Sequence, residues 1–333
     1  MRTPKKNLIV FDMDGVIVDV SASYRETVRR TARLFFKGAP GWRSLPDPLF
    51  SLHDLAGVKH SGGLNNDWEL TYRILSLLMT RIKLPGDIPA AHPWSMHAYG
   101  MKHADISALI HFLSVHDAPM RRLLEENGHQ NHVFIQHLSG HDVGTGNVIK
   151  QIFQEIYLGQ RLFRATYHFP ARVYTEDGLI DRETLLMAPA LLQALAADNV
   201  LGIATGRPRA EADYPLDRFN IRPYFKSIYS LDDCLREENR ILEKNHKKVA
   251  RSKPHPFMLD AIATCHENST SNRYYVGDMP DDMQAASRSR FGFKGIGISV
   301  SAPDKAGLHQ ALEKAGAHYI INDFHELKEI LTQ

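Results

Sequence analysis

Several short apolar runs in this chain end abruptly on polar residues. Each run is nearly continuous in apolar residues rather than alternating, as expected for strands buried on both faces of a sheet. The strands predicted in this way are residues 8–11, 200–204, 274–276, 295–298 and 319–321. The pattern indicates parallel strands in the centre of a domain.

Helical stretches separate the later strands. They are predicted at residues 189–197, 256–264, 280–287, 304–315 and 324–332. Strands that alternate with helices predict an α/β fold with a parallel, doubly wound sheet. In such sheets ligands bind beyond the carboxyl ends of the strands, where the strand order reverses.

Residues 20–172 break this rhythm, because they have helical periodicity and no visible strands. Helices are predicted there at residues 24–36, 68–82, 106–115 and 148–158. A chain of 333 residues is also long for one core. We therefore expect a core domain of residues 1–19 and 173–333, with a mostly helical domain, residues 20–172, inserted after the first strand. The charged run 232–248 is interpreted as a surface helix or a second, smaller excursion.

Composition places the chain among soluble globular proteins, with 43% hydrophobic and 23% charged residues. The net charge of +2 and the lack of a clustered basic face argue against a nucleic-acid partner. No apolar run approaches the length of a membrane span, and no signal peptide is recognisable. The two cysteines, Cys234 and Cys265, fit a reducing compartment. We expect a cytoplasmic protein that acts on neither nucleic acid nor membranes.

Polar clusters follow three of the predicted strands directly. Their residues are Asp12, Asp14, Thr205, Gly206, Arg207, Asp278 and Asp282. Because the carboxyl ends of parallel strands meet at one edge of a sheet, we expect these side chains to converge. Four acids in one crevice would raise each other's pKa unless a cation lies among them. Ligation by oxygen alone favours Mg²⁺.

Other residues would complete a site for phosphate. Lys253, which precedes a helix opened by proline, would add a positive charge, and Thr205 would add a hydroxyl group and backbone N–H donors. Mg²⁺, a lysine and N–H donors around a carboxylate suit phosphoryl transfer. Arg207 and Arg209 would either touch a substrate phosphate or be surface charges on a loop, and the sequence leaves both readings open.

Four short motifs occur in a fixed order along the chain. They are Asp12-Met13-Asp14-Gly15-Val16, Thr205-Gly206, Lys253-Pro254 and Gly277-Asp278-x-x-x-Asp282. Together they resemble the four motifs of the haloacid dehalogenase (HAD) superfamily, over residues 7–19 and 175–331. The insertion between the first two motifs is similar in position to the cap (C1 type) of the phosphoglycolate-phosphatase-like branch, subfamily IA, although it is larger. Residues 19–25 and 62–68 resemble an uncharacterised hypothetical subgroup of that branch.

The resemblance implies a Rossmann-like core and magnesium-dependent hydrolysis of a small phosphorylated metabolite. Asp12 would attack phosphorus and form an aspartyl-phosphate intermediate. Asp14 would protonate the leaving oxygen and then deprotonate the hydrolytic water. Thr205, with Gly206 and Arg207, would bind the transferring phosphoryl group.

The resemblance also implies how the charges of such a site are balanced. Lys253 would hold Asp12 and the phosphate together. Mg²⁺ would be bound by Asp12, by the backbone carbonyl of Asp14 and by Asp278, with Asp282 supporting the ion from close by.

Alternatives to a phosphatase remain open from the sequence. A phosphomutase would keep the same core residues. A phosphonate hydrolase would need a Schiff-base lysine from the inserted domain, and no lysine there stands in a context that singles it out. A non-catalytic binding module would have no need of Asp12 and Asp14 together, and a dehalogenase would lack Asp14.

Three features of the inserted domain are candidate binding elements. Nine of the 18 histidines lie between His92 and His141 without a tight ligand spacing, so we expect partly exposed histidines rather than a metal site. The polar segment 62–68 would contact substrate or form an interhelical turn. The loop 142–147 would bind an anion or cap the helix that follows it.

Overall fold

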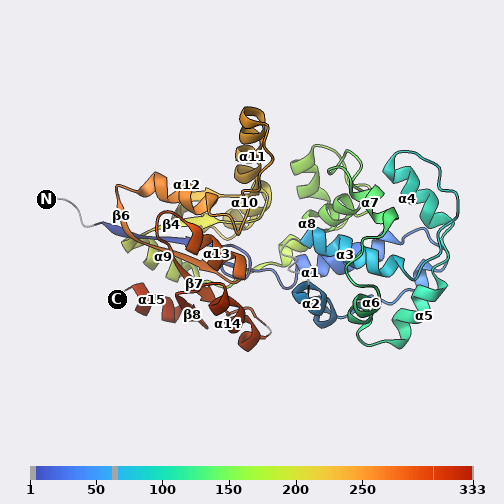
Figure 1. Cartoon of the computed structure of the whole chain (residues 1–333), viewed down its shortest axis with the longest axis horizontal. Helices are drawn as coiled ribbons and strands as arrows, with labels where there is room; N and C mark the ends of the chain where they lie inside the picture. The colour runs from blue at the N-terminus through green and yellow to red at the C-terminus, as the bar shows by residue number, and fades with distance from the viewer. Residues whose placement is uncertain (1–4, 62–66, 303, 332–333) are drawn as a thin grey trace. The chain divides into compact units, whose positions relative to one another are not determined.

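The computed structural model describes residues 5–61, 67–302 and 304–331, and its chain divides into two compact units (Figure 1). The core unit comprises Met1–Val20 and Glu183–Gln333, and the inserted unit comprises Ser21–Arg182. The second junction therefore lies after Arg182 rather than after residue 172. Residues 172–174 belong to the inserted unit because their backbone N–H groups donate hydrogen bonds of 2.7–3.1 Å to the buried carboxylate of Glu155.

The core unit contains a six-stranded sheet in which every neighbouring pair is parallel. Its strands are β1 (Lys6–Phe11), β4 (Asn199–Ala204), β5 (Phe225–Tyr229), β6 (Thr270–Gly277), β7 (Lys294–Ile298) and β8 (Tyr319–Ile321). The strand order is β5-β4-β1-β6-β7-β8. The predicted α/β fold with a doubly wound parallel sheet is confirmed. Because β1 pairs with both β4 and β6, its carboxyl end lies at the switch in strand order.

Helices cover both faces of this sheet (Figure 1). They are α9 (Pro189–Asp198), α10 (Arg209–Arg218), η3 (Arg222–Tyr224), α11 (Leu231–Asn245), α12 (Phe257–His266), α13 (Pro280–Arg288), α14 (Lys305–Lys314) and α15 (His325–Leu331). One apolar cluster joins β1 to α9, α10 and α15, and a second joins the opposite face of β1 to α11, α12 and α13. Burial on both faces explains the continuous apolar runs of the central strands.

The edge strand β5 is absent from the predicted strands, for a physical reason. It pairs only with β4, and Lys226 is exposed while Ser227 is half-buried, so the segment has no continuous apolar run. A second, two-stranded antiparallel ribbon joins β2 (Val18–Asp19) to β3 (Thr184–Leu185). The ribbon brings together the two places where the chain leaves and re-enters the core unit.

In the described part of the inserted unit, all regular secondary structure is helical, apart from isolated bridges. Its helices are α1 (Tyr24–Phe35), η1 (Trp42–Ser44), α2 (Leu52–Ser61), α3 (Asp67–Met79), α4 (Pro93–Lys102), α5 (Ser107–Val115), α6 (Pro119–Asn127), α7 (Val133–Ser139), α8 (Val148–Tyr167) and η2 (Leu179–Arg182). The predicted end of a helix at residue 158 coincides with a kink in α8 at Gly159, whose φ is +68°. A Cβ atom at Gly159 would lie 2.2 Å from the backbone nitrogen of Gly178, so only glycine allows this approach. Within the described ranges, no helix has the length and apolar content to cross a membrane.

His97 of α4 is a buried histidine inside the inserted unit. Its Nε2 lies 2.8 Å from the backbone oxygen of Phe35. Burial lowers the pKa of His97 to about 4, and the hydrogen bond to Phe35 offsets only part of that effect. The ring is therefore neutral in the folded protein at neutral pH.

We expect the inserted unit to lose stability as the pH falls below about 6.5. The unfolded chain then binds a proton at His97, whose ordinary pKa is 6.5, whereas the folded chain binds it only near pH 4. This difference corresponds to about 2 kcal/mol at pH 5 and is absent well above pH 6.5. Urea unfolding at pH 7.5 and pH 5 should show a smaller loss in His97→Gln than in wild type or in His111→Gln, which alters an exposed histidine. Equal losses in all three proteins would refute the assignment.

Candidate active site

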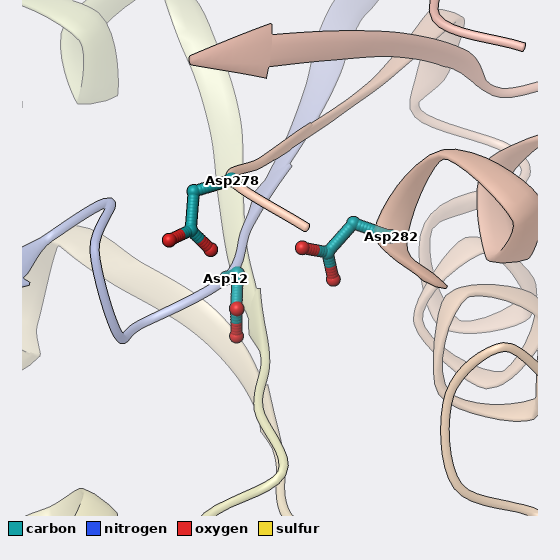
Figure 2. A group of neighbouring side chains, drawn as sticks. All are labelled: Asp12, Asp278 and Asp282. Atoms are coloured by element: carbon teal, nitrogen blue, oxygen red, sulfur yellow. The ribbon is translucent and has the colours of Figure 1, made fainter. Parts of the chain in front are cut away.

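Three buried or half-buried carboxylates meet at the carboxyl edge of the sheet. Asp12 follows β1, Asp278 follows β6, and Asp282 lies in the first turn of α13. One oxygen from each carboxylate lies within 4.8 Å of the others (Figure 2). The sheet fixes this arrangement, because β1 and β6 are adjacent and the N–H of Asp12 donates to the Val276 carbonyl at 2.8 Å. The expected convergence of these three acids is present in the structure.

Lys253 joins two of these acids. Its Nζ lies 2.8 Å from Oδ1 of Asp12 and 2.8 Å from Oδ1 of Asp282. The hydroxyl of Tyr275 donates a 2.9 Å hydrogen bond to the same Asp282 oxygen. Among the lysines that crowd this part of the sequence, Lys253 is thus the one whose ammonium group sits against Asp12.

The charges in this cluster are not balanced. Burial raises the pKa of Asp12 to about 7, although the ammonium group of Lys253 opposes the rise. Burial, with the charges of Asp12 and Asp282, also raises the pKa of Asp278 well above its ordinary value. For Lys253, burial favours the neutral amine, but Asp12 and Asp282 outweigh it and raise the lysine pKa.

Three carboxylates and a single ammonium group favour the binding of a further cation. Their donor set consists of oxygens only, which fits a hard divalent ion such as Mg²⁺. Such an ion would also lower the pKa values of Asp12 and Asp278, which burial and the neighbouring carboxylates raise. Asp282 has a second function, because its Oδ2 accepts a 3.0 Å hydrogen bond from the N–H of Met279 and so caps α13.

Asp14 lies outside this group of three acids in the structure. Its Oδ1 accepts a 2.6 Å hydrogen bond from Nε of Arg207. The side chain of Asp14 is 34% exposed, whereas that of Arg207 is 1% exposed. The reading of Arg207 as a surface charge is therefore wrong. Its guanidinium group binds Asp14 and Glu183, and the expected contact of Arg207 with substrate stays a prediction.

Thr205 and Gly206 form the turn at the end of β4. The N–H of Thr205 donates to the Tyr229 carbonyl at 3.0 Å, so this N–H is already used, and a contact of the hydroxyl with phosphate stays a prediction. That hydroxyl accepts a 3.1 Å hydrogen bond from the N–H of Arg207. Gly206 is exposed, and nothing lies within 4 Å of the position that a Cβ would take.

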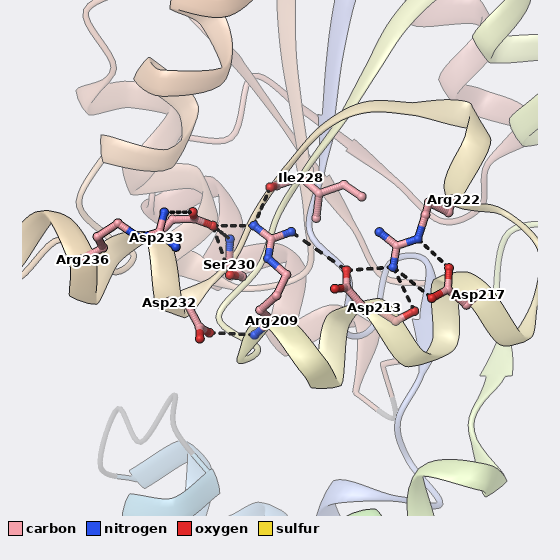
Figure 3. Close-up of polar contacts among 9 residues, drawn as sticks. All are labelled: Arg209, Asp213, Asp217, Arg222, Ile228, Ser230, Asp232, Asp233 and Arg236. Carbon is pink, nitrogen blue, oxygen red and sulfur yellow. Dashed lines mark hydrogen bonds and ion pairs between the residues drawn. The ribbon is translucent and has the colours of Figure 1, made fainter. Parts of the chain in front are cut away.

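Arg209 belongs to a separate network of ion pairs (Figure 3). Its Nη2 donates to Asp233 at 2.7 Å and to the Ile228 carbonyl at 2.9 Å, and its backbone N–H donates to Asp232 at 2.7 Å. These bonds join the first turn of α10 to the end of β5 and the start of α11. Arg209 thus fixes the loop that follows Thr205 and does not contact the three acids.

Gly15 makes the close approach of Asp278 possible. Its φ is +72°, and a Cβ there would lie 2.1 Å from Oδ2 of Asp278. Ser301 also donates a 3.2 Å hydrogen bond to the Gly15 carbonyl, which holds the turn in place.

We expect Gly15→Ala to lower activity at least about 10-fold, because misplacing a reacting group by 1 Å is enough for about a 100-fold loss. The left-handed backbone adds a stability cost of about 1–2 kcal/mol. Steady-state kinetics and thermal unfolding would measure both effects. Gly86→Ala is the matched control, since Gly86 has ordinary φ and open space around its Cβ position. A Gly15→Ala protein with wild-type activity would show that Asp278 need not stay in place.

The inserted unit contains three other candidate binding elements. Asn147 caps α8 itself, because its Oδ1 accepts a 2.9 Å hydrogen bond from the N–H of Lys150, so the capping reading of the loop 142–147 holds. Among the residues that the structure describes, no histidine joins a group that could hold a metal ion. Residues 62–66, most of the expected substrate loop, lie outside the described residues, and residues 67 and 68 begin α3.

Two residues near the acids have no recognisable signal in the sequence. Tyr275 lies inside an apolar strand, where its hydroxyl group gives no separate signal. Glu183 follows Asp181 and Arg182 in a charged stretch typical of a solvated loop, yet it is completely buried. No local pattern identifies it, because its partner Arg207 lies 24 residues away.

A known protein family and a curated relative match most of this chain. The family model described as haloacid dehalogenase-like hydrolase matches residues 6–290. A curated protein of Phytophthora nicotianae, named imidazoleglycerol-phosphate dehydratase, is 36% identical over 335 residues, which cover 96% of this chain and 51% of that protein. The chain thus spans about half the length of this relative.

Solved structures share the fold at low identity. A Northeast Structural Genomics Consortium target matches with a TM-score of 0.67 and 22% identity, covering 99% of this chain and 98% of that chain. Phosphatase Tt82 from Thermococcus thioreducens matches with a TM-score of 0.53 and 18% identity, covering 92% of this chain and 99% of that chain. The family model matches most of the chain, and the motif residues gather at one edge of the sheet. This chain therefore belongs to the haloacid dehalogenase-like hydrolase family.

Proposed function

We propose that this hydrolase is a phosphatase that cleaves a small phosphate monoester in a magnesium-dependent reaction, with Asp12 as the nucleophile. The observation that carries the proposal is the contact of Lys253 with Asp12 inside a cluster of three carboxylates. A carboxylate held by a half-buried ammonium group, beside a site for a hard cation, is suited to receive a phosphoryl group.

The proposed reaction has two displacements at phosphorus. In the first, Asp12 attacks phosphorus, the bond to the leaving oxygen breaks, and Asp14 gives its proton to that oxygen. In the second, Asp14 takes a proton from water, and the water oxygen attacks the phosphorus of the aspartyl phosphate. The bond between phosphorus and Asp12 then breaks, which returns the free carboxylate and releases inorganic phosphate.

Other residues would bind and orient the phosphoryl group. Lys253 would offset the like charges of Asp12 and the phosphate, and the Thr205 hydroxyl would donate a hydrogen bond to it. Bound Mg²⁺, held by Asp12, Asp278 and the Asp14 carbonyl with Asp282 close by, would supply positive charge to the phosphoryl oxygens.

The names of two relatives bear on the substrate class. Tt82 is named a phosphatase, and the Phytophthora protein is named for a phosphate ester that it dehydrates. Both names concern phosphate compounds, which supports a small phosphorylated metabolite as the substrate. We propose no dehydration for this chain, because a carboxylate nucleophile held by a lysine suits phosphoryl transfer.

A panel of phosphorylated metabolites, assayed with Mg²⁺ for released phosphate, tests the proposal. We expect at least one metabolite to give stoichiometric phosphate and the free alcohol. A phosphomutase would instead move the phosphoryl group to another hydroxyl of the substrate, which product analysis by NMR would detect. No phosphate release from any compound would argue against a phosphatase.

Removal of the metal is expected to abolish activity. We predict a loss of at least about 100-fold in EDTA, with recovery on adding Mg²⁺. Because Asp12 has a pKa of about 7 before an ion binds, Mg²⁺ must displace a proton below that pH. The Mg²⁺ concentration for half-maximal activity should therefore rise as the pH falls below about 7. Full activity in EDTA would exclude this role for the carboxylates.

A further inference from the structure

Arg207 binds Asp14 on one edge and Glu183 on the other. Its Nε donates to Oδ1 of Asp14 at 2.6 Å, and its Nη1 and Nη2 donate to the two oxygens of Glu183 at 3.0 and 3.1 Å. Nη1 also donates to the Glu211 carbonyl at 3.1 Å. Arg207 and Glu183 are buried, so the pair is removed from solvent. A bidentate pair of this kind fixes the plane of the guanidinium group.

The backbone around this pair is also held firmly. The Arg207 carbonyl accepts a 2.9 Å hydrogen bond from the N–H of Leu231, and the Glu183 carbonyl accepts one of 3.2 Å from Arg218. Glu183 directly precedes β3, which pairs with β2 a few residues after Asp14. The backbone and the guanidinium group of Arg207 are therefore both held by groups other than Asp14.

Asp14 would have more freedom without this contact. It is the partly exposed acid of the motif, and it lies outside the group formed by the other three carboxylates. The bond from Arg207 engages Oδ1 and leaves Oδ2 to carry the proton. The direction in which Asp14 presents that oxygen thus depends on where Arg207 is held.

We propose that Arg207 is a positioning residue for Asp14, and that Glu183 holds Arg207 in the orientation this requires. The proposal rests on the function proposed above, in which Asp14 protonates the leaving oxygen and later activates water. Arg207 acts through Asp14 and does not itself touch the reacting atoms.

This role has a kinetic signature that a structural role lacks. The value of kcat/KM covers the steps up to departure of the leaving group, which need a proton only when that group is basic. A misplaced Asp14 should therefore lower kcat/KM for phenyl phosphate much more than for p-nitrophenyl phosphate. Because Asp14 also activates water in the second displacement, kcat should fall for both compounds.

The test variant is the double substitution Glu183→Gln with Arg207→Met, which removes both buried charges and leaves neither unpaired. We expect kcat/KM to fall about 10- to 100-fold for phenyl phosphate and less than about 3-fold for p-nitrophenyl phosphate. Arg207→Lys is the second variant, since lysine keeps the charge but lacks the fork that reaches both acids. If the double variant folds poorly, Arg207→Lys provides the test, and it should show the same selective loss.

Arg222→Met is the matched control, because Arg222 also pairs with a carboxylate, but with Asp217 instead of Asp14. It should keep the wild-type ratio between the two substrates. Equal losses for both substrates in the Arg207 variants would overturn the positioning role and leave only a structural pair. Failure of the proposed function would look different, because wild type would then release no phosphate, or Asp12→Asn would remain active.

Discussion

Replacing Asp12 with Asn is expected to reduce phosphate release by roughly 10⁴-fold or more, as for the loss of a catalytic nucleophile. The amide has nearly the same shape as the carboxylate, but it cannot form an aspartyl phosphate. It also removes a negative charge from a buried cluster in which burial and the neighbouring acids raise the pKa of Asp12 to about 7. Folding should therefore be retained, and the variant should melt at or above the wild-type temperature.

The matched control is Asp281→Asn in the same turn of α13. Asp281 lies next to Asp282 in sequence but outside the group of three carboxylates. We expect this variant to keep activity within about 3-fold of wild type, because the substitution leaves the three carboxylates and Lys253 in place. Phosphate release by both variants, measured at saturating Mg²⁺, tests whether Asp12 is the nucleophile. Substantial turnover by Asp12→Asn would remove Asp12 from the role of nucleophile.

Replacing Lys253 with Met should damage both stability and catalysis. The change leaves Asp12 and Asp282 buried without their ammonium partner, and breaking a buried pair in this way costs about 3–5 kcal/mol. Loss of a positive donor beside the transferring phosphoryl group should lower kcat about 10²- to 10³-fold. Because Lys253 now opposes the rise in the pKa of Asp12, its loss would raise that pKa further.

Lys248→Met is the control for this substitution, since Lys248 is an exposed lysine in the preceding loop. Urea unfolding and steady-state kinetics of both variants would measure the effects. Added Mg²⁺ should restore part of the lost stability in Lys253→Met, because an ion that binds only the folded state stabilises it. A Lys253→Met protein as stable and active as the Lys248→Met control would contradict the charge balance described for the site.

The central strands of the fold could be predicted because burial on both faces demands continuous apolar runs. The same reasoning brings Asp12, Asp278 and Asp282 together, since strand ends in a parallel sheet share an edge. It fails for β5, because an edge strand has one open side and Lys226 and Ser227 interrupt its apolar residues. A continuous apolar run therefore marks a strand in the centre of the sheet and does not mark one at its edge.

The surroundings of Asp14 could not be predicted in the same way. The loop after β4 gave no sign that Arg207 is buried against Glu183. That pairing depends on the β2–β3 ribbon, which has two residues in each strand and no recognisable pattern. The second junction was likewise missed, because the contact of Glu155 with residues 172–174 is a tertiary contact.

The most direct measurement of the central claim is a search for phosphate on Asp12 during turnover. The Asp14→Asn variant would be mixed with p-nitrophenyl phosphate and Mg²⁺ and quenched in acid within milliseconds. The good leaving group needs no proton, whereas hydrolysis of the intermediate lacks its base, so the phosphoenzyme should accumulate. We predict a burst of p-nitrophenol matched by phosphate on the peptide that contains Asp12, as read by mass spectrometry. A burst with phosphate on another residue, or turnover with none on Asp12, would contradict the account.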